Sequence, residues 1–487
     1  MTTSNPVTRR TVIGGLGALP VAAALSGTLG AGAARAANRN KVIVVGAGLS
    51  GLNAALLLEE QGVDVQVLEG RQRIGGRVLS QRNVPGNPES GGTTVYPGYA
   101  RVLDACKRFK VDLIDVTPIV PFFRDRELVL DGKLVTPAEW PTHPRNTLPA
   151  NARNSMPWAY LNPIIGRSNP LKTTDAWLDP ANAKYDVSLR QWLTELGVPD
   201  ETIELCWNIN PGYGTTADDV SAMMIMFSAA FTMSQMRLAG RTYGYTAVGG
   251  NQSIPEAMAK GLRKPVRLGC NVVGIRSDDQ GAEVHCADGT IFKADHVISS
   301  LPTSVLRRVR IDPLVKGAQA VAINTLAGQP VNLLHLTVKK PFWEEDGRNP
   351  AVFSDGIASM IVPERDAKSP KDVLSLTIWV RGRHATWMDT LQHDDAVAAI
   401  VDDFCRIRPA AKGKVEPKAY HSWYQDQFAA GDWALWAPGQ VSAFASAVGK
   451  SHGRIHFCGE HTAVSNRGME GAMESGERAA FEILGLV

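Results

Sequence analysis

The sequence lacks the features that define several classes of protein. Its six cysteines lie far apart, without a Cys-x-x-Cys pair or a short Cys/His cluster, so neither a disulfide framework nor a zinc site is indicated. Six buried free thiols are expected instead, at Cys106, Cys206, Cys270, Cys286, Cys405 and Cys458. An excess of one charge is also missing, because 51 Lys and Arg residues stand against 48 Asp and Glu residues, a net charge of +3. That balance gives no indication of a nucleic-acid partner.

Long apolar runs are scarce too, except near the N-terminus. Arg9 and Arg10 precede a weakly hydrophobic, Gly/Ala-rich stretch, and residues 34–36 have the small-x-small form of a cleavage site. The pattern predicts a twin-arginine signal peptide over residues 1–36 and export to the periplasm or the extracellular space. A single membrane anchor is the alternative, but the many glycines and Pro20 disfavour a stable span. No later run of ~20 apolar residues appears, so no stable membrane span is expected.

What the sequence does contain is enough apolar residues for a sizeable core. Of its 487 residues, 44% are hydrophobic and 20% are charged, which is typical of a globular protein and excludes a disordered chain. At ~150 residues per domain, this length favours two or three domains.

A nucleotide-binding pattern begins at Lys41. Residues 41–45 form a β-branched run that leads directly into a Gly-x-Gly-x-x-Gly motif at 46–51, followed by an expected helix at 52–61 and a strand at 63–68. Glu69 ends that strand, 18 residues after the last glycine, where a ribose hydroxyl needs an acceptor. The motif therefore predicts a dinucleotide site with its pyrophosphate at the helix N-terminus, formed by Gly46, Gly48, Ser50, Gly51 and Glu69.

Two further stretches carry a resemblance to a known family. Residues 69–77 (Glu-Gly-Arg-Gln-Arg-Ile-Gly-Gly-Arg) and 88–93 (Pro-Glu-Ser-Gly-Gly-Thr) resemble the flavin-binding pattern of the flavin amine oxidases, which include monoamine, polyamine and L-amino acid oxidases. The resemblance implies FAD rather than a nicotinamide cofactor, which would not need the second stretch. It assigns Arg71, Gly76 and Arg77 to the pyrophosphate side, and Gly91, Gly92 and Thr93 to the isoalloxazine side.

The C-terminal end resembles the same family. A strand is expected before residues 459–462, and a helix is expected to begin at Gly468. The resemblance places Gly459 and Glu460 near the ribityl-phosphate, and the helix N-terminus at Gly468 and Met469 against the flavin pyrimidine ring, where its positive end stabilises the reduced form. It also implies a backbone contact of Val272 near the adenine and packing of Trp423 against the flavin.

The resemblance implies a fold and a division into domains. It covers roughly residues 40–100, 245–345 and 415–487. We expect an α/β protein whose Rossmann-type FAD domain is assembled from residues 37–115, 243–305 and 420–487. An inserted α+β substrate domain takes residues 116–242 and 306–419. The oligomeric state stays open, with a homodimer as one option.

The substrate side departs from the family pattern. Residues 423–433 align without a gap with the monoamine oxidase stretch that carries the covalent flavin cysteine, and here that position is Asp432. Since aspartate cannot form the thioether, we expect noncovalent FAD. Trp433 falls on one wall of the family's aromatic cage, where a ring face meets the substrate amine. The opposite wall falls on Gly468, which leaves the cage open.

The family lysine that holds a water near the flavin is absent. Counted back from Pro341, its position falls on Leu333. His335 points the same way on the expected strand, so its imidazole either reaches the flavin through a bulge or hydrogen-bonds within the wall. Loss of the lysine favours a slow oxidase, or a dehydrogenase that passes electrons to a protein acceptor instead of O2.

The substrate class is only partly indicated. The arginine that clamps the carboxylate in L-amino acid oxidases falls on Thr94, which disfavours α-amino acids and leaves Arg101 and Arg467 as candidate cations. Residues 204–240 are rich in Met and Phe, and form either an apolar pocket lining or plain core. We expect oxidation of an apolar or aromatic amine to an imine, by hydride transfer to flavin N5. The alternatives are a desaturase or oxidase of a carbon skeleton, resembling phytoene desaturases and protoporphyrinogen oxidases, and a non-catalytic electron carrier.

Overall fold

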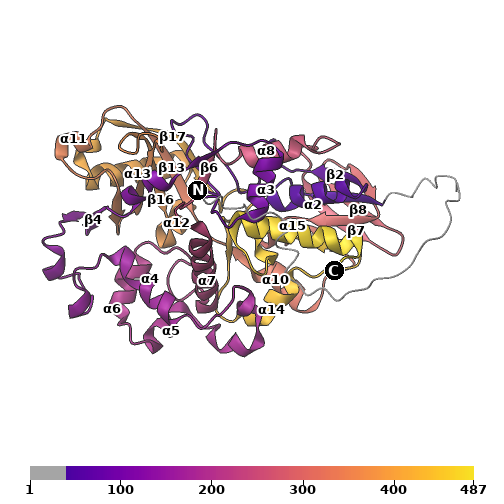
Figure 1. Ribbon diagram of the computed structural model, residues 1–487, viewed down its shortest axis with the longest axis horizontal. Helices are drawn as coiled ribbons and strands as arrows, with labels where there is room; N and C mark the ends of the chain where they lie inside the picture. The colour runs from indigo at the N-terminus through magenta and orange to yellow at the C-terminus, as the bar shows by residue number, and fades with distance from the viewer. Residues whose placement is uncertain (1–39) are drawn as a thin grey trace, which may run out of the picture.

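The structure is a computed structural model that describes residues 40–487 (Figure 1). The predicted signal peptide over residues 1–36, and the export inferred from it, lie outside the described residues. Within residues 40–487, no helix has both the length and the apolar character needed to cross a membrane.

A parallel sheet of four strands forms the centre of the nucleotide-binding half. Its order is β19 (Ile455–Phe457), β10 (His296–Ser299), β1 (Lys41–Val45) and β2 (Asp64–Leu68). The strands come from three distant parts of the chain, and their side chains are mostly buried because helices cover one face of the sheet and a second sheet packs on the other. All four carboxyl ends lie at the same edge, which is where open parallel sheets bind ligands.

Two helices pack together against this sheet. Helix α2 (Leu49–Glu60) lies beside α15 (Gly468–Leu484), although they are separated by most of the chain (Figure 1). A Cβ at Gly476 would lie 2.1 Å from the Ser50 carbonyl oxygen, so the contact requires glycine. The Asn53 side-chain amide donates a 2.7 Å hydrogen bond to the Met473 carbonyl oxygen across the same contact. The first turn of α2 therefore packs against the middle of α15.

The remaining strands form a second four-stranded sheet, a seven-stranded sheet and two sheets of two strands each. One sheet has the order β11 (Arg310–Asp312), β7 (Val272–Ser277), β8 (Ala282–Cys286) and β9 (Ile291–Ala294). A seven-stranded, largely antiparallel sheet has the order β17 (Val415–Ser422), β13 (Asn332–Val338), β16 (Val373–Val380), β15 (Met360–Arg365), β14 (Val352–Ser354), β4 (Glu127–Leu130) and β5 (Lys133–Val135). Most of its strands come from the predicted inserted segments, and the exact domain boundaries stay a prediction.

Helices complete the structure around these sheets. The inserted half carries α4 (Pro157–Ser168), α5 (Leu189–Glu195), α6 (Asp200–Ile203), α7 (Ala222–Ala239), α11 (Trp343–Asp346), α12 (Gly382–Met388) and α13 (His393–Ile407). The other elements are α3 (Ala100–Arg108), β3 (Leu113–Asp115), β6 (Tyr245–Ala247), α8 (Ser253–Lys260), α9 (Thr303–Leu306), α10 (Gly317–Thr325), β12 (Ala327–Gly328), β18 (Ala434–Leu435) and α14 (Gln440–Val448).

The six cysteines are all free, as expected, but the prediction that all six are buried was wrong. Cys106, Cys286 and Cys458 are buried, while the other three are partly exposed. Spacing alone indicates the absence of disulfides and says little about the depth of each thiol.

Candidate active site

One cavity of about 560 Å³ runs from the carboxyl edge of the parallel sheet to the seven-stranded sheet. Most of the residues that the sequence assigned to a flavin line it together. They are Gly46, Gly48, Ser50, Glu69, Arg71, Gly76, Arg77, Gly91, Gly92, Thr93, Val272, Glu460, Gly468 and Met469, with Trp433 at the substrate side. Stretches that lie hundreds of residues apart in the sequence therefore form one continuous wall.

The phosphate end is made by backbone at the start of α2. Gly46 has a φ of +103°, which favours glycine, and Gly51 must lack a Cβ because that atom would lie 2.1 Å from the Gly46 carbonyl oxygen. At Gly48, by contrast, a Cβ would meet no protein atom within 4 Å. The N-cap at Gly48 offers no side-chain hydrogen bond, so the first amides of α2 stay available to an anion.

Charged side chains around this end are held in place by one another. Glu69 accepts hydrogen bonds from the amides of Ala47 (2.8 Å) and Arg71 (2.9 Å), which fixes the turn after β2. Arg71 forms a 2.6 Å ion pair with Asp426, and Arg77 forms a 3.0 Å ion pair with Glu460. The cations are thus oriented without a ligand.

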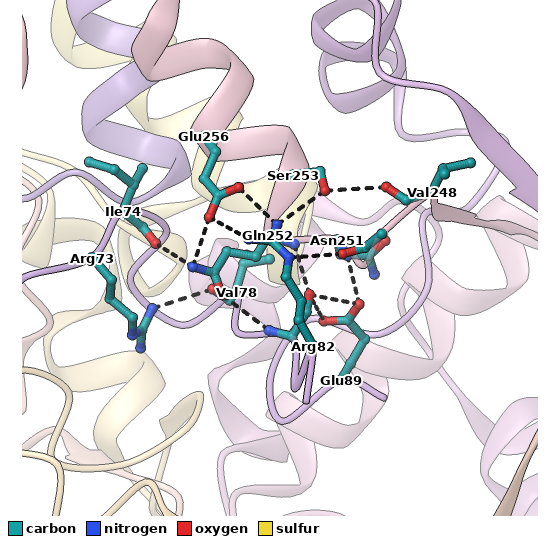
Figure 2. Close-up of polar contacts among 12 residues, drawn as sticks. Arg73, Ile74, Val78, Arg82, Glu89, Val248, Asn251, Gln252, Ser253 and Glu256 are labelled. Carbon is teal, nitrogen blue, oxygen red and sulfur yellow. Dashed lines mark hydrogen bonds and ion pairs between the residues drawn. The ribbon is translucent and has the colours of Figure 1, made fainter. Parts of the chain in front are cut away.

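A polar network around Glu89 and Asn251 fixes the wall at residues 91–93, and Figure 2 shows these two side chains with their neighbours. Glu89 accepts the Asn251 amide at 2.6 Å and the Ser80 hydroxyl at 2.9 Å, and burial raises the pKa of Glu89 to about 8. The Asn251 side chain in turn donates to the carbonyl oxygens of Gly92 (2.8 Å) and Thr93 (2.6 Å). Arg82 and Glu256 form a 2.8 Å ion pair that ties the same loop to α8. The loop therefore presents a rigid backbone to the cavity.

These residues fit FAD along its length. Helix α15 begins at Gly468 without a side-chain cap, so its N-terminal amides also remain free at the far side of the cavity. A Cβ at Gly91 would lie 1.9 Å from the Arg77 carbonyl oxygen, and one at Gly92 would lie 2.8 Å from the Met469 sulfur. Glycine at these two positions thus lets the loop pack closely on Arg77 and Met469, which line the cavity with it, while Glu69 lies at the end expected for the ribose.

Five residues predicted for the site do not line the cavity. Gly51 serves the packing at the start of α2, as described above. Gly459, with a φ of +129°, donates its amide to the Ser475 hydroxyl at 2.9 Å. Trp423 is fully buried, and its indole donates a 2.5 Å hydrogen bond to the Ser90 carbonyl oxygen. Trp423 therefore supports the wall behind Gly91, and its ring does not face the cavity.

Leu333 and His335, the remaining two, also lie inside the wall. Leu333 is 0% exposed and packs with Trp423. The strand pair β13–β17 is irregular after His335, as a bulge requires, yet the imidazole hydrogen-bonds to Ser90 Oγ (2.8 Å) and Thr377 Oγ1 (3.0 Å). Burial lowers the pKa of His335 to about 4, so the ring is neutral at pH 7. Of the two alternatives for His335, the structure has the wall hydrogen bonds, and a flavin contact by His335 was wrong.

Aromatic side chains form the substrate end. Trp433 lines the cavity and meets Tyr213 edge to face, with ring centroids 5.4 Å apart. Trp379 lines it as well, from the position directly opposite Leu333 across β13 and β16. Tyr213 belongs to the segment that the sequence offered as a possible pocket lining, whereas sequence reasoning missed Trp379, because only the strand register brings it to the cavity. The open cage expected from Gly468 stays a prediction.

The Met-rich segment is core rather than pocket lining. Met223, Met224 and Phe227 of α7 are buried, and Phe227 stacks on Trp177 at 4.7 Å. Of the aromatic and methionine residues in 204–240, only Tyr213 lines the cavity, and Met233 is 44% exposed. A stripe of apolar residues on one helix does not distinguish these two roles.

The substrate end of the cavity has charged residues of its own. Asp432 faces the cavity, and burial raises the pKa of its carboxyl to about 7. Arg101 is committed to ion pairs with Glu470 (3.1 Å) and Glu477 (2.6 Å), so it is not the substrate cation considered from the sequence. Thr94 lines the cavity, and Arg381, which the sequence did not single out, does so too.

Comparisons with known proteins agree with this site. Similar proteins include an amine oxidase [flavin-containing] of Danio rerio, 24% identical over 92% of this chain and 86% of that protein. An L-amino-acid oxidase of Demansia vestigiata is 26% identical over 93% and 88%. The solved structure of putrescine oxidase bound to putrescine has a TM-score of 0.71 at 22% identity, over 92% of this chain and 99% of that one.

A cyclohexylamine oxidase from Brevibacterium oxydans has the same TM-score of 0.71 at 20% identity, again over 92% and 99% of the two chains. At such identities these structures show the shared fold, which confirms the predicted two-domain α/β architecture. The model of one family, described as flavin containing amine oxidoreductase, matches residues 49–484. This chain therefore belongs to the flavin-containing amine oxidoreductase family.

Proposed function

We propose that this enzyme oxidises a C–N bond of an amine with an aromatic or alkyl body, using noncovalently bound FAD. The observation that carries the proposal is the single cavity that joins the nucleotide-binding backbone of α2 to the rings of Trp433 and Tyr213. The putrescine and cyclohexylamine of the similar solved structures are amines with alkyl bodies, which supports this substrate class.

The flavin, when bound, accepts a hydride equivalent from the carbon next to nitrogen, which leaves an imine for water to hydrolyse. The chain orients the amine and keeps water out. Trp433 offers its ring to the amine, and Tyr213 holds Trp433 in place by edge-to-face contact. Desolvation in this aromatic end lowers the pKa of a bound amine and favours its reactive neutral form. A dedicated base is therefore not required.

Noncovalent binding follows from the chemistry of Asp432. Its carboxylate occupies the position of the family's thioether cysteine, and its backbone oxygen accepts a hydrogen bond from Arg77 at 2.5 Å. An aspartate has no thiol, so the cofactor is held by the arginines, the helix N-termini and Glu69. The family's lysine position is taken by Leu333, which lies inside the wall, so no side chain from this position holds a water in the cavity. This favours slow reaction with O2 or a protein electron acceptor.

An anaerobic titration tests the proposal. Flavin-loaded protein is mixed with benzylamine, 2-phenylethylamine, cyclohexylamine and putrescine while the visible flavin band is recorded. Bleaching by at least one of these amines, with the aldehyde or ketone as product, is the expected result. A flavin that can be photoreduced but that no amine bleaches would contradict an amine substrate. Admission of air to the reduced protein then measures the rate of reaction with O2.

The export prediction is part of the same proposal. A twin-arginine signal at residues 1–36 would carry the folded, flavin-loaded protein to the periplasm or the extracellular space. Replacing Arg9 and Arg10 by lysine should retain the protein in the cytoplasm, as cell fractionation would measure. Unchanged export of that variant would contradict the twin-arginine route.

A further inference from the structure

Arg381 is a partly buried cation without a hydrogen-bond or ion-pair partner for its side chain among the described residues, at the substrate end of the cavity. It follows β16 and lines the cavity together with Trp379 and Asp432. Its Nε is buried and makes no hydrogen bond, and its terminal nitrogens donate none to the described residues while retaining accessible surface. Its carbon Cζ lies 4.5 Å from the centroid of the Trp379 ring, which supports the guanidinium from one side. The edge of the Arg381 guanidinium that carries its N–H donors is thus free to bind a ligand.

The backbone around Arg381 fixes its direction. Gly382 has a φ of +59°, and a Cβ there would lie 2.9 Å from Pro211 Cγ. The glycine therefore lets the end of β16 pack directly against the loop that carries Tyr213. Arg381 and Tyr213 come from distant segments, but this contact holds both at one end of the cavity.

Two more arginines near this end also lack an acidic partner. Arg467 lies over the Tyr213 ring at 4.8 Å, and the side chain of Arg126 donates only to the Phe123 carbonyl oxygen (3.1 Å) and, weakly, to the sulfur of Met360 (3.6 Å). Among the described residues, no carboxylate lies within 4.0 Å of the guanidinium of Arg126, Arg381 or Arg467. Burial of uncompensated cations is costly, so the structure favours a ligand that brings negative charge.

The nearest acids supply that charge only in part. The charge of Asp432 opposes the lowering of the Arg381 pKa, but Asp432 makes no hydrogen bond or ion pair with Arg381, and burial raises its own pKa to about 7. Arg381 also borders a second cavity of about 470 Å³ lined by three acids, of which Glu204 and Asp355 are paired with Arg190 and Arg145, while Glu201 is exposed to solvent. Burial lowers the pKa of Arg381 itself to about 10, so it remains charged at pH 7.

We propose that the amine substrate carries a carboxylate, and that Arg381 binds it through the open edge of its guanidinium. A planar guanidinium matches a carboxylate with two parallel hydrogen bonds. The proposal rests on the proposed amine oxidation at the same site and specifies its substrate. Thr94 at the family's arginine position had disfavoured α-amino acids as substrates. The proposal revises that inference, because Arg381 at the end of β16 supplies the cation in place of a residue in the loop after 88–93.

Binding of benzoate to the oxidised, flavin-loaded protein tests the anion site without turnover. Benzoate should shift the visible flavin spectrum, and Arg381→Met should weaken its affinity at least tenfold, since a charge-assisted pair is worth about that factor. Arg381→Lys should recover part of the loss because it retains the charge but not the fork. Benzyl alcohol, the neutral analogue, should bind equally to all variants.

Arg383→Met is the matched control. Arg383 lies two residues away, is exposed and lines only the second cavity, so this variant should bind benzoate like the unmodified protein. Equal benzoate affinity in Arg381→Met and the unmodified protein would overturn the proposal. If Arg383→Met lost as much benzoate affinity as Arg381→Met, the proposal would also be overturned, because the loss would then reflect the overall charge of the protein and not a specific site.

Matched amine pairs show where the carboxylate lies. Anaerobic flavin reduction is compared for 2-phenylethylamine against phenylalanine, and for benzylamine against 4-(aminomethyl)benzoate. The carboxylated member of at least one pair should reduce the flavin faster, and Arg381→Met should remove that advantage. No advantage in either pair would contradict the proposal, even if amines bleach the flavin. Failure of every amine, with Arg381-dependent benzoate binding retained, would instead reject the amine chemistry alone.

Discussion

The two ends of the cavity are built on opposite principles. At the flavin end, Arg71 and Arg77 are paired with Asp426 and Glu460, and Glu69 is held in place by two backbone amides. At the substrate end, Arg381 and Arg467 rest on aromatic rings and lack acidic partners among the described residues. A cofactor site must be rigid before the cofactor binds, while a site for a transient ligand can leave charge for that ligand to neutralise.

The largest effect is expected at Gly48, where the fold tolerates a side chain and the cofactor does not. The Cβ added by Gly48→Val would meet no protein atom within 4 Å, and the side chain would enter the cavity at the place expected for the pyrophosphate, so FAD affinity should fall by about 100-fold or more. The visible absorbance of the purified protein measures retention, and circular dichroism checks the fold. Gly51→Val is the comparison: its Cβ would meet the Gly46 carbonyl oxygen at 2.1 Å, so this variant should lose the fold itself. Full flavin retention in Gly48→Val would place the cofactor elsewhere.

The next prediction tests whether Leu333 is buried inside the cavity wall or faces the cavity. Leu333→Lys buries a cation at a site with 0% exposure, so it should cost about 3 kcal/mol of stability and bring no faster reaction with O2. Leu333→Met, which conserves volume, should cost less than about 1.5 kcal/mol. Denaturant unfolding and stopped-flow reoxidation measure the two quantities. Faster reoxidation in Leu333→Lys would mean that residue 333 faces the flavin.

Two tryptophans of one segment should respond in different ways. Trp433→Ala removes the ring beside the substrate and should slow flavin reduction by amine about tenfold, with the flavin retained. Trp423→Ala empties a fully buried site and should instead lower stability by about 3 to 5 kcal/mol. Stopped-flow reduction and thermal unfolding separate these outcomes. The reverse pattern would exchange the roles assigned to the two rings.

Much of the flavin end could be predicted from the sequence, since its residues belong to local motifs. The strand at 41–45, the glycines at 46–51 and the start of α15 at Gly468 are each set by neighbouring residues, and the structure has them where expected. The substrate end could not be predicted in the same way. Trp379 reaches it through the register of β13 with β16, and Arg381 through the contact of Gly382 with Pro211. Such contacts depend on tertiary packing and leave no local pattern.

The last prediction concerns the pH dependence of stability that arises from the network behind the flavin loop. Burial raises the pKa of Glu89 from 4.5 to about 8, so the folded state holds a proton that the unfolded state releases between these values. The stability present below pH 4.5 is therefore lost as pH rises to about 8, by about 1 kcal/mol per unit. Glu89→Gln should lose less stability than the unmodified protein between pH 5.5 and about 8, as denaturant unfolding would measure. Parallel curves for the two proteins would contradict the raised pKa.

The visible spectrum of the purified protein, before and after acid precipitation, tests the central claim most directly. The account predicts a yellow protein with a flavin absorbance band, and acid should release all of that flavin into the supernatant as FAD. A protein that stays colourless when FAD is supplied during refolding would contradict the site, and flavin retained in the precipitate would contradict its noncovalent binding.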